Sequence, residues 1–237
     1  MLACVGDVHR SFGLLERLVG RLPRAVQAVV QVGDLGLTRA DVERLADGGP
    51  PPLRLDRPVH WIDGNWDDFG GLGLRDLDVP TALAPGLVYV PRGTVLELGG
   101  LRIGCLGGAE SLDGERSRAR GVDWWPDLEG VTDADVTRLV RAATRTRGVD
   151  LLVAHTPPAP TVAAMTGRPA HPSAVRVHQA QAALGWPPVV AGHMHRSWQD
   201  VSRRVQVLDE LEARFIDGGG PPTSLGDRTP RRAEGGA

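Results

Sequence analysis

Polar side chains follow five apolar segments of this 237-residue chain, and their types are those of metal-ion ligands. The segment 2–5 is apolar and uncharged, and Gly6, Asp7 and His9 come after it. Because residues i and i+2 of an extended segment point the same way, Asp7 and His9 converge beyond the end of a predicted buried strand. Open α/β sheets bind ligands at such strand ends. One Asp-x-His is weak evidence, but the arrangement recurs.

Similar polar residues follow four later apolar segments. The whole set at the five predicted strand ends is Asp7, His9, Asp34, Asn65, His155, His193 and His195. Carboxylate, amide and imidazole groups without a thiolate are typical of Mn²⁺, Fe or Zn²⁺ sites and fit Ca²⁺ poorly. Seven ligands exceed what one tetrahedral ion needs, whereas two ions that share a bridging carboxylate would use them all. The set therefore predicts two divalent ions.

The first third of the chain alternates predicted strands and helices. Apolar runs predict strands at 2–5, 26–32 and 59–62, and helical spacing predicts helices at 14–22 and 38–46. This order is typical of parallel βαβ units.

The later part is richer in strands. We predict strands at 88–90, 94–98, 101–106, 149–154, 187–191, 197–201 and 205–208, and helices at 132–147 and 173–184. Thr38 and Thr132 are the predicted N-caps, and Gly99-Gly100 predicts a tight hairpin. Segment 70–85 is predicted to be irregular, and segment 107–130 is polar and rich in turn residues. We predict one domain over 1–217 and a disordered tail over 218–237, which has almost no apolar content.

Composition indicates a globular protein, with 41% hydrophobic and 24% charged residues and a formal net charge of −2. Nothing in this balance indicates a nucleic-acid or membrane surface built on bulk charge. No apolar run approaches the roughly 20 residues of a membrane span, and no charged-then-apolar signal opens the chain, so we predict a cytoplasmic protein. Cys4 and Cys105 lie in apolar runs and are predicted to be buried. The oligomeric state is not predicted.

In order and spacing, the polar motifs resemble those of the calcineurin-like metallophosphoesterase superfamily over residues 1 to about 208. The motifs are GDVH at 6–9, GDLG at 33–36, GNWD at 64–67, AH at 154–155 and GHMH at 192–195. The resemblance implies two mixed β-sheets packed face to face and flanked by helices, a four-layer α/β/β/α sandwich.

The resemblance also implies a role for each ligand. Three ligands would hold a first ion, three a second, and one would bridge both: Asp7, His9 and His195; Asn65, His155 and His193; and Asp34. The family's reaction is the hydrolysis of a phosphate ester by in-line attack of a metal-bridging hydroxide. The predicted catalytic residues are Asp7, His9, Asp34 and Asn65. Mn²⁺ is the predicted metal, with Fe, Zn²⁺ or Ni²⁺ as alternatives.

One departure from the family pattern bears on the substrate. The family usually has GNH followed by Asp or Glu, and that His serves near the leaving group, but here the position is Trp66. An indole N–H cannot deliver a proton to an alkoxide at neutral pH. Asp67, which would orient the missing imidazole, is predicted to have lost its partner. Some small phosphodiesterase branches also lack this His, so we predict a phosphodiesterase. A phosphomonoesterase acting on phosphoprotein or a nucleotide, and a non-catalytic metal-binding scaffold, are the alternatives.

The predicted substrate contacts are Asn65, Trp66, Arg10 and Arg120. Arg10 follows the GDVH motif, where its guanidinium could hold a phosphate, and a solvated arginine is the equal alternative. The stretch from Gly107 to Pro126 resembles a bacterial branch with a GGA…WWP segment. Its arginines and its Trp pair could contact phosphate and stack on a base, or the Trp pair could pack the loop onto the domain. The predicted partner is a phosphate-ester small molecule, a nucleotide or a nucleic acid. His171 and His178 are predicted surface residues.

Overall fold

Two mixed β-sheets form the centre of the protein in a computed structural model that describes residues 1–111, 114–216 and 223–224. The strands of the first sheet are β1 (Leu2–Val5), β2 (Ala28–Gln31), β3 (Val59–Trp61), β4 (Thr81–Ala84), β5 (Leu87–Tyr89), β12 (Ala213–Ile216) and β13 (Thr223–Ser224). Those of the second are β6 (Thr94–Leu98), β7 (Leu101–Leu106), β8 (Leu151–Ala154), β9 (Val189–Ala191), β10 (Trp198–Asp200) and β11 (Val205–Val207).

Each sheet has a parallel centre with antiparallel strands at its edges. The order is β13-β12-β1-β2-β3-β5-β4 in the first sheet and β10-β11-β9-β8-β7-β6 in the second. The strands β1, β2, β3 and β5 are parallel neighbours, as are β7, β8, β9 and β11. The carboxyl ends of these strands therefore lie along one edge of each sheet, where the predicted ligands begin.

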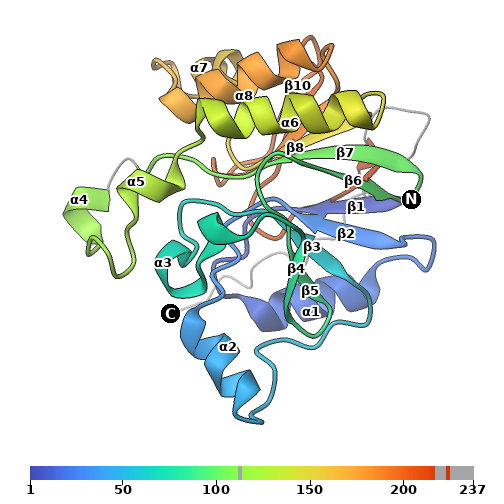
Figure 1. The fold of residues 1–237 in the computed structure, drawn as a ribbon. Helices are drawn as coiled ribbons and strands as arrows, with labels where there is room; N and C mark the ends of the chain where they lie inside the picture. Colours follow the sequence, from blue (N-terminus) through green and yellow to red (C-terminus); the bar gives the residue numbers. More distant parts are fainter. Residues whose placement is uncertain (112–113, 217–222, 225–237) are drawn as a thin grey trace, which may run out of the picture.

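The helices lie outside the two sheets (Figure 1). They are α1 (Phe12–Arg21), α2 (Arg39–Ala46), α3 (Phe69–Leu72), the 3₁₀ turn η1 (Leu74–Asp76), α4 (Gly114–Ser117), α5 (Pro126–Glu129), α6 (Asp133–Arg145), α7 (Ala159–Thr166) and α8 (Pro172–Ala183). The predicted N-caps are confirmed, because Thr38 begins α2 and Thr132 begins α6, each in a reciprocal capping box with Asp41 or Asp135.

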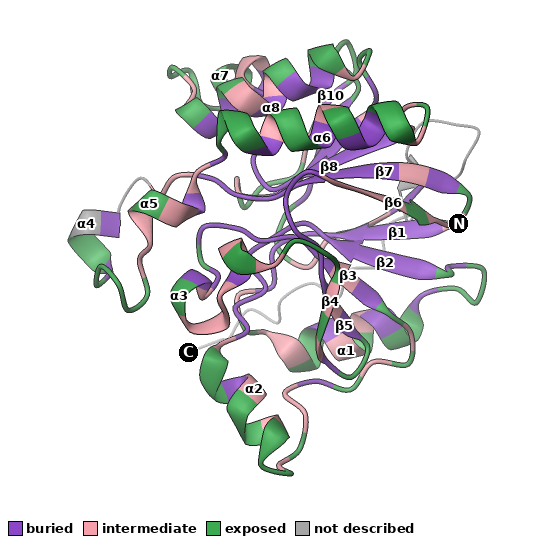
Figure 2. Ribbon diagram, in the orientation of Figure 1, coloured by how far each residue is buried: buried purple, intermediate pink, exposed green. Residues whose placement is uncertain are grey.

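Three clusters of buried apolar side chains separate the four layers, and β1 contributes to two of them. Ala3 and Val5 pack with α1, whereas Leu2 and Cys4 pack between the sheets. A third cluster joins the second sheet to α6 and α8. The central strands β1, β2, β8 and β9 are buried on both faces, whereas the edge strands β4 and β6 are only partly buried, and the long helices are buried along one side (Figure 2). The predicted fold of two mixed, face-to-face sheets flanked by helices is confirmed.

Several local predictions were wrong or incomplete. Segment 70–85 is not irregular, because it holds the end of α3, the turn η1 and strand β4, which pairs antiparallel with β5. Helix α7 and strand β12 were not predicted; β12 pairs with β1, Leu2 opposite Ile216. The predicted disordered tail lies outside the described residues except for Thr223–Ser224, which pair with β12.

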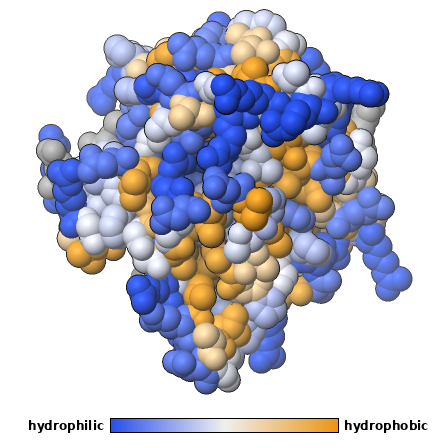
Figure 3. Space-filling view, viewed as in Figure 1, coloured by the Kyte–Doolittle hydropathy of each residue, from blue (hydrophilic) through white to orange (hydrophobic). Residues whose placement is uncertain are grey.

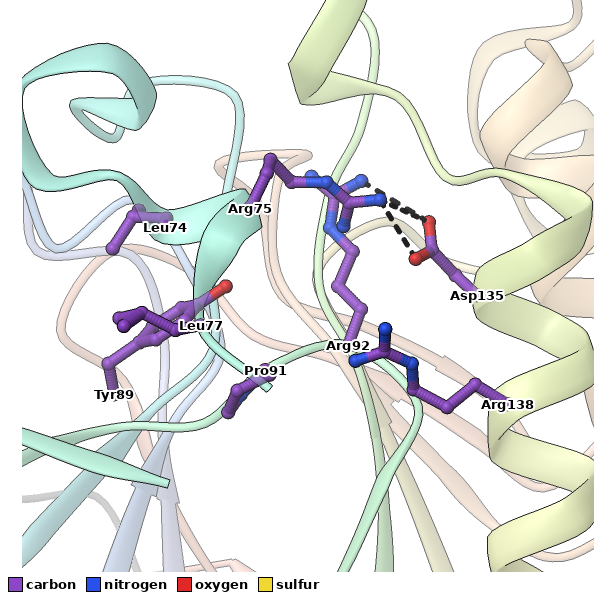
Figure 4. Close-up of a pocket in the computed structure, with 8 residues that line it drawn as sticks. All are labelled: Leu74, Arg75, Leu77, Tyr89, Pro91, Arg92, Asp135 and Arg138. Atoms are coloured by element: carbon purple, nitrogen blue, oxygen red, sulfur yellow. Dashed lines mark hydrogen bonds and ion pairs between the residues drawn. The ribbon is translucent and has the colours of Figure 1, made fainter. Parts of the chain in front are cut away.

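The outward face of α6 is hydrophilic, with arginines at positions 141 and 145 exposed (Figure 3). On its inward side, a cavity of about 30 Å³ lies between α6, η1 and β5 (Figure 4). Arg75 donates to Asp135 at 2.9 Å across this cavity, and Arg92 is wholly buried beside it. The space suffices for about two waters at most, so this is a structural joint rather than a ligand site. No described helix is long and apolar enough to cross a membrane.

Candidate metal centre

Four of the predicted ligands form one compact group at the strand ends. One ligand atom from each of Asp7, His9, Asp34 and His195 lies within 4.8 Å of the other three. The His195 Nε2 atom is 3.3 Å from Asp7 Oδ2, and His9 Nε2 is 3.8 Å from Asp34 Oδ2. The two Nε2 atoms face each other at 3.0 Å. Two carboxylates and two imidazoles thus surround one point.

Asn65 and His155 adjoin this group on the other side of Asp34. His155 Nε2 lies 3.5 Å from Asp34 Oδ1 and 3.1 Å from Asn65 Oδ1. His155 Nδ1 donates to the Val32 carbonyl at 2.8 Å, which leaves Nε2 with a lone pair in the neutral ring. The Asn65 amide nitrogen donates to Ser111 Oγ at 3.0 Å, which fixes Oδ1 as the atom facing His155. His155 Nε2, Asn65 Oδ1 and Asp34 Oδ1 therefore converge, an arrangement that a shared cation or proton would stabilise.

The proximity of Asp34 and His155 shifts the pKa of each. Burial opposes ionisation of Asp34, but the neighbouring His155 and His9 hold the pKa of its carboxyl well below the usual range. Burial alone would lower the pKa of His155, yet Asp34 and Asp7 raise it to about 10. Asp34 Oδ2 is buried and has no hydrogen-bond donor among the described residues. A buried carboxylate oxygen without a donor is the strongest sign that a cation belongs here.

His193 completes the set from the loop after β9. Its backbone N–H donates to both Asp7 oxygens at 3.0 and 3.2 Å, and its ring lies 5.0 Å from that of His155. Burial and the nearby His155 lower the pKa of His193 to about 3, so its ring is neutral and keeps a lone pair. All seven predicted residues are therefore gathered at one edge, and their division between two ions stays a prediction.

Backbone strain is concentrated at the same place. Four of the predicted ligands are non-glycine residues with positive φ: His9 at 45°, Asp34 at 57°, His193 at 66° and His195 at 46°. Such conformations cost roughly 1–3 kcal/mol each and cluster at functional sites. Gly64 and Gly192 are required nearby, because a Cβ at either position would collide with the carboxylate of Asp34 or Asp7.

The donor set fits divalent ions such as Mn²⁺, Fe²⁺ or Zn²⁺, which accept mixed oxygen and imidazole ligands. His195 Nδ1 lies 3.3 Å from Glu210, so its second nitrogen faces a carboxylate, as is usual for metal-binding histidines.

Asp67 is not the orphan that the sequence predicted. Its carboxylate accepts hydrogen bonds from the backbone N–H groups of Asp34, Gly36 and Gly64, at 2.7 to 3.1 Å, and from the Trp61 indole at 3.3 Å. It is 1% exposed. The residue binds the loops after β2 and β3 together and needs no imidazole partner.

Two predicted phosphate contacts have other partners in the structure. The Arg10 guanidinium donates to the Gly36 carbonyl at 2.8 Å and to Asp41 at 3.1 Å. Arg120 forms an exposed ion pair with Asp127 at 2.6 Å. Among the described residues, neither guanidinium bonds a gathered ligand, because Asp41 on α2 and Asp127 on α5 pair with them instead. Their contact with substrate stays a prediction without structural support.

The arginine that does reach the site is Arg118, which the sequence did not single out. It is 8% exposed and donates to Ser111 Oγ at 2.6 Å and to the Asn65 carbonyl at 2.8 Å. Ser111 also bonds Glu129, through its N–H at 2.7 Å and its hydroxyl at 3.0 Å. Segment 107–130 therefore reaches back and orients Asn65. Three alternating arginines in a turn carry no signal of which one points inward.

Trp125 packs against the core, whereas His171 lies beside the site. Trp125 packs against the core cluster beneath the first sheet and covers Gly70, which supports the packing interpretation of that residue. His171, which was predicted to be a surface residue, is partly exposed, and its ring lies 6.3 Å from that of His193, beside the gathered ligands. It begins α8 and had no place in the motifs.

Comparison with known proteins gives distant structural likenesses. No family model and no curated protein matches the chain. The structure of phosphopantetheinyl hydrolase (PptH) from Mycobacterium tuberculosis is similar, at 16% identity and a TM-score of 0.44, over 89% of each chain. NAD nucleotidase (NadN) from Haemophilus influenzae is similar at 13% identity and a TM-score of 0.40, over 93% of this chain and 43% of the other.

Proposed function

We propose that the chain is a metal-dependent phosphoesterase that holds two divalent ions and favours phosphodiesters. One observation carries the proposal. One oxygen of the buried Asp34 carboxylate, Oδ2, has no hydrogen-bond partner among the described residues. The carboxylate stands between two groups of candidate metal ligands, with His9 3.8 Å from Oδ2 and His155 3.5 Å from Oδ1. A carboxylate in that position is suited to bridging two cations.

The residues around Asp34 supply the positions that such a reaction needs. When bound, two divalent ions lower the pKa of a water and polarise the phosphoryl oxygens. Asp7 is 1% exposed and is fixed by the His193 N–H, so its oxygens face His195 without competition from solvent. Asn65 is held at two points: its side-chain amide nitrogen donates to Ser111, and its backbone carbonyl accepts from Arg118. The arrangement is rigid, which favours electrostatic preorganisation.

The preference for diesters rests on Trp66. Its side chain stands beside His9, with the two ring centroids 6.0 Å apart, and it offers no group that can protonate an alkoxide. A substrate whose leaving group departs as a stable anion needs no such proton. A phosphomonoesterase, in which His171 or a solvent proton serves the leaving group, is the second candidate.

The test is hydrolysis of bis(p-nitrophenyl) phosphate with Mn²⁺. Asp34→Asn should lower the rate by at least about a hundred-fold, because it removes the shared carboxylate. His178→Asn is the matched control, since His178 lies within α8 and outside the gathered ligands. Metal content is measured on each variant, so that a lost ion and a lost step are distinguished.

Two results would overturn the proposal: an unchanged rate in Asp34→Asn, or no turnover of mono- or diesters with Mn²⁺, Fe²⁺, Zn²⁺ or Ni²⁺. Bound metal without turnover would favour the scaffold alternative. A faster rate on p-nitrophenyl phosphate than on the diester would favour the phosphomonoesterase.

A further inference from the structure

Trp66 exposes an indole beside the candidate metal centre. The residue is 44% exposed, although it follows the buried Asn65 directly. Its backbone N–H donates to Asp34 Oδ1 at 2.8 Å, which fixes the start of the side chain against the central carboxylate. Its ring meets that of His9 edge to face, with centroids 6.0 Å apart and planes at 88°. A large apolar surface is thus held at the rim of the site.

Arg118 lies against the Trp66 ring and is itself held rigidly. The Cζ atom of Arg118 is 4.3 Å from the indole centroid, within the range of a cation–π contact. The same guanidinium donates to Ser111, to the Asn65 carbonyl and to the Asp123 carbonyl. With its donors already in use and 8% of its surface exposed, Arg118 cannot swing away. The open part of the indole is therefore the part that Arg118 does not cover.

A rigid, partly exposed indole is suited to stacking. Aromatic side chains bind nucleobases through their ring faces, with little dependence on which base is present. Exposure of this ring gains nothing for the fold, since the buried Trp61 shows that the chain can bury an indole nearby. In a nucleotide, the ribose joins the phosphate to the base, so a phosphate at Asp34 and a base on Trp66 belong to one ligand.

We propose that Trp66, backed by Arg118, is a stacking platform for the nucleobase of the substrate, so that the favoured diesters are nucleotide esters. The inference rests on the proposed function, because it needs a phosphate at the gathered ligands. It assigns to Trp66 a binding role in place of the proton delivery that an imidazole would perform there.

The test compares two monoesters that differ only by a base. AMP and ribose 5-phosphate are titrated calorimetrically into the protein loaded with Mn²⁺, which makes binding rather than turnover the readout. We expect AMP to bind on the order of ten-fold more tightly, as one stacked base contributes. In Trp66→Leu the two affinities should become equal, with that for ribose 5-phosphate unchanged. Trp66→Phe should keep most of the preference.

Trp186→Leu is the control, because Trp186 is 50% exposed and lies beyond the C-terminal end of α8. Equal affinities for the two monoesters in the unaltered protein would overturn the platform but leave the proposed function standing. A preference for AMP that persists in Trp66→Leu would also overturn it. If neither monoester binds to the Mn²⁺-loaded protein, the platform fails, and hydrolysis of bis(p-nitrophenyl) phosphate decides separately whether the proposed function stands.

Discussion

At the scale of single residues, Asp67 explains how the loops of the site hold their strained shape. Its carboxylate accepts three backbone N–H groups from the turns after β2 and β3 and one indole N–H from Trp61. Asp34, whose φ is 57°, is among the donors. Burial and the nearby Asp34 raise the pKa of Asp67 to about 7, whereas the N–H groups of Gly36 and Gly64 favour its charged form. The cost of the strained conformation is offset by these hydrogen bonds, which contribute roughly 0.5–1.5 kcal/mol each.

Asp67→Asn should therefore destabilise the fold by roughly 2–4 kcal/mol, because an amide has one acceptor oxygen and turns an N–H₂ group towards N–H donors. Equilibrium unfolding in urea measures the loss. Exposed Asp47, at the end of α2, is the matched control, and Asp47→Asn should change stability by less than about 0.5 kcal/mol. Equal stabilities of the two variants would mean that Asp67 is a remnant of catalysis rather than a structural residue.

At the scale of elements, buried charges join the first sheet to segment 107–130 and to α6. Arg92 and Asp63 are both fully buried, and their ion pair is completed by the Tyr89 hydroxyl, which donates to Asp63 at 2.9 Å. Arg92 also donates to the Glu129 carbonyl at 2.8 Å. Asp135 on α6 lies 3.7 Å from the same guanidinium. The segment that orients Asn65 is thereby anchored through charge as well as packing.

Asp135→Asn should remove stability in a pH-dependent manner. Burial opposes ionisation of Asp135, but Arg92, Arg75 and the Thr132 N–H lower the pKa of its carboxyl. A lowered folded pKa gives stability that is full above the unfolded pKa of about 3.9 and is lost as the pH falls through the folded value. We expect the free energy of unfolding to fall by roughly 3 kcal/mol at neutral pH and by less below about pH 4. Denaturant titrations at a series of pH values measure this difference.

Asp133→Asn is the comparison variant for α6, because Asp133 is exposed and pairs with Arg176 at the surface. Its effect should be small at every pH, since exposed ion pairs contribute about 0–1 kcal/mol. A loss in Asp135→Asn that stays constant down to the acid transition would show that the cap and not the charge is responsible.

Helices and strands that are marked by a local sequence pattern could be predicted from the sequence. Those that form only by pairing with a distant part of the chain could not. Strand β1 is a short apolar run that ends at glycine, and α6 starts at a capping threonine, so both were visible locally. Strand β12 (ARFI) has no alternation and exists because β1 offers it an edge. The gathered ligands were visible because each lies within four residues of the carboxyl end of a strand. Arg118 was not, because the turn around Ala119, which accepts the Trp124 N–H, decides which arginine points inward.

At the scale of the whole molecule, the cluster between the two sheets makes the layers one cooperative unit. It takes side chains from both sheets, including Cys4 of β1 and Cys105 of β7, which are fully buried and free. Within the part of the chain that the structure describes, no helix residue belongs to this cluster, and Cys4 and Cys105 are 0% exposed, so we expect them to reach solvent when the sheets separate. The two thiols can therefore report on separation of the layers.

The sequence has two cysteines, and neither should react with a thiol reagent in the native protein at about pH 8. Burial raises the pKa of Cys4 to about 12, and burial together with the neighbouring Cys4 raises that of Cys105 as well, so thiolate is scarce even where a reagent enters. Both thiols should label in concentrated guanidinium chloride. At intermediate denaturant, labelling should follow the loss of circular dichroism, because opening of this interface is global unfolding. Labelling that precedes this loss would show that the two sheets part while each still keeps its strands.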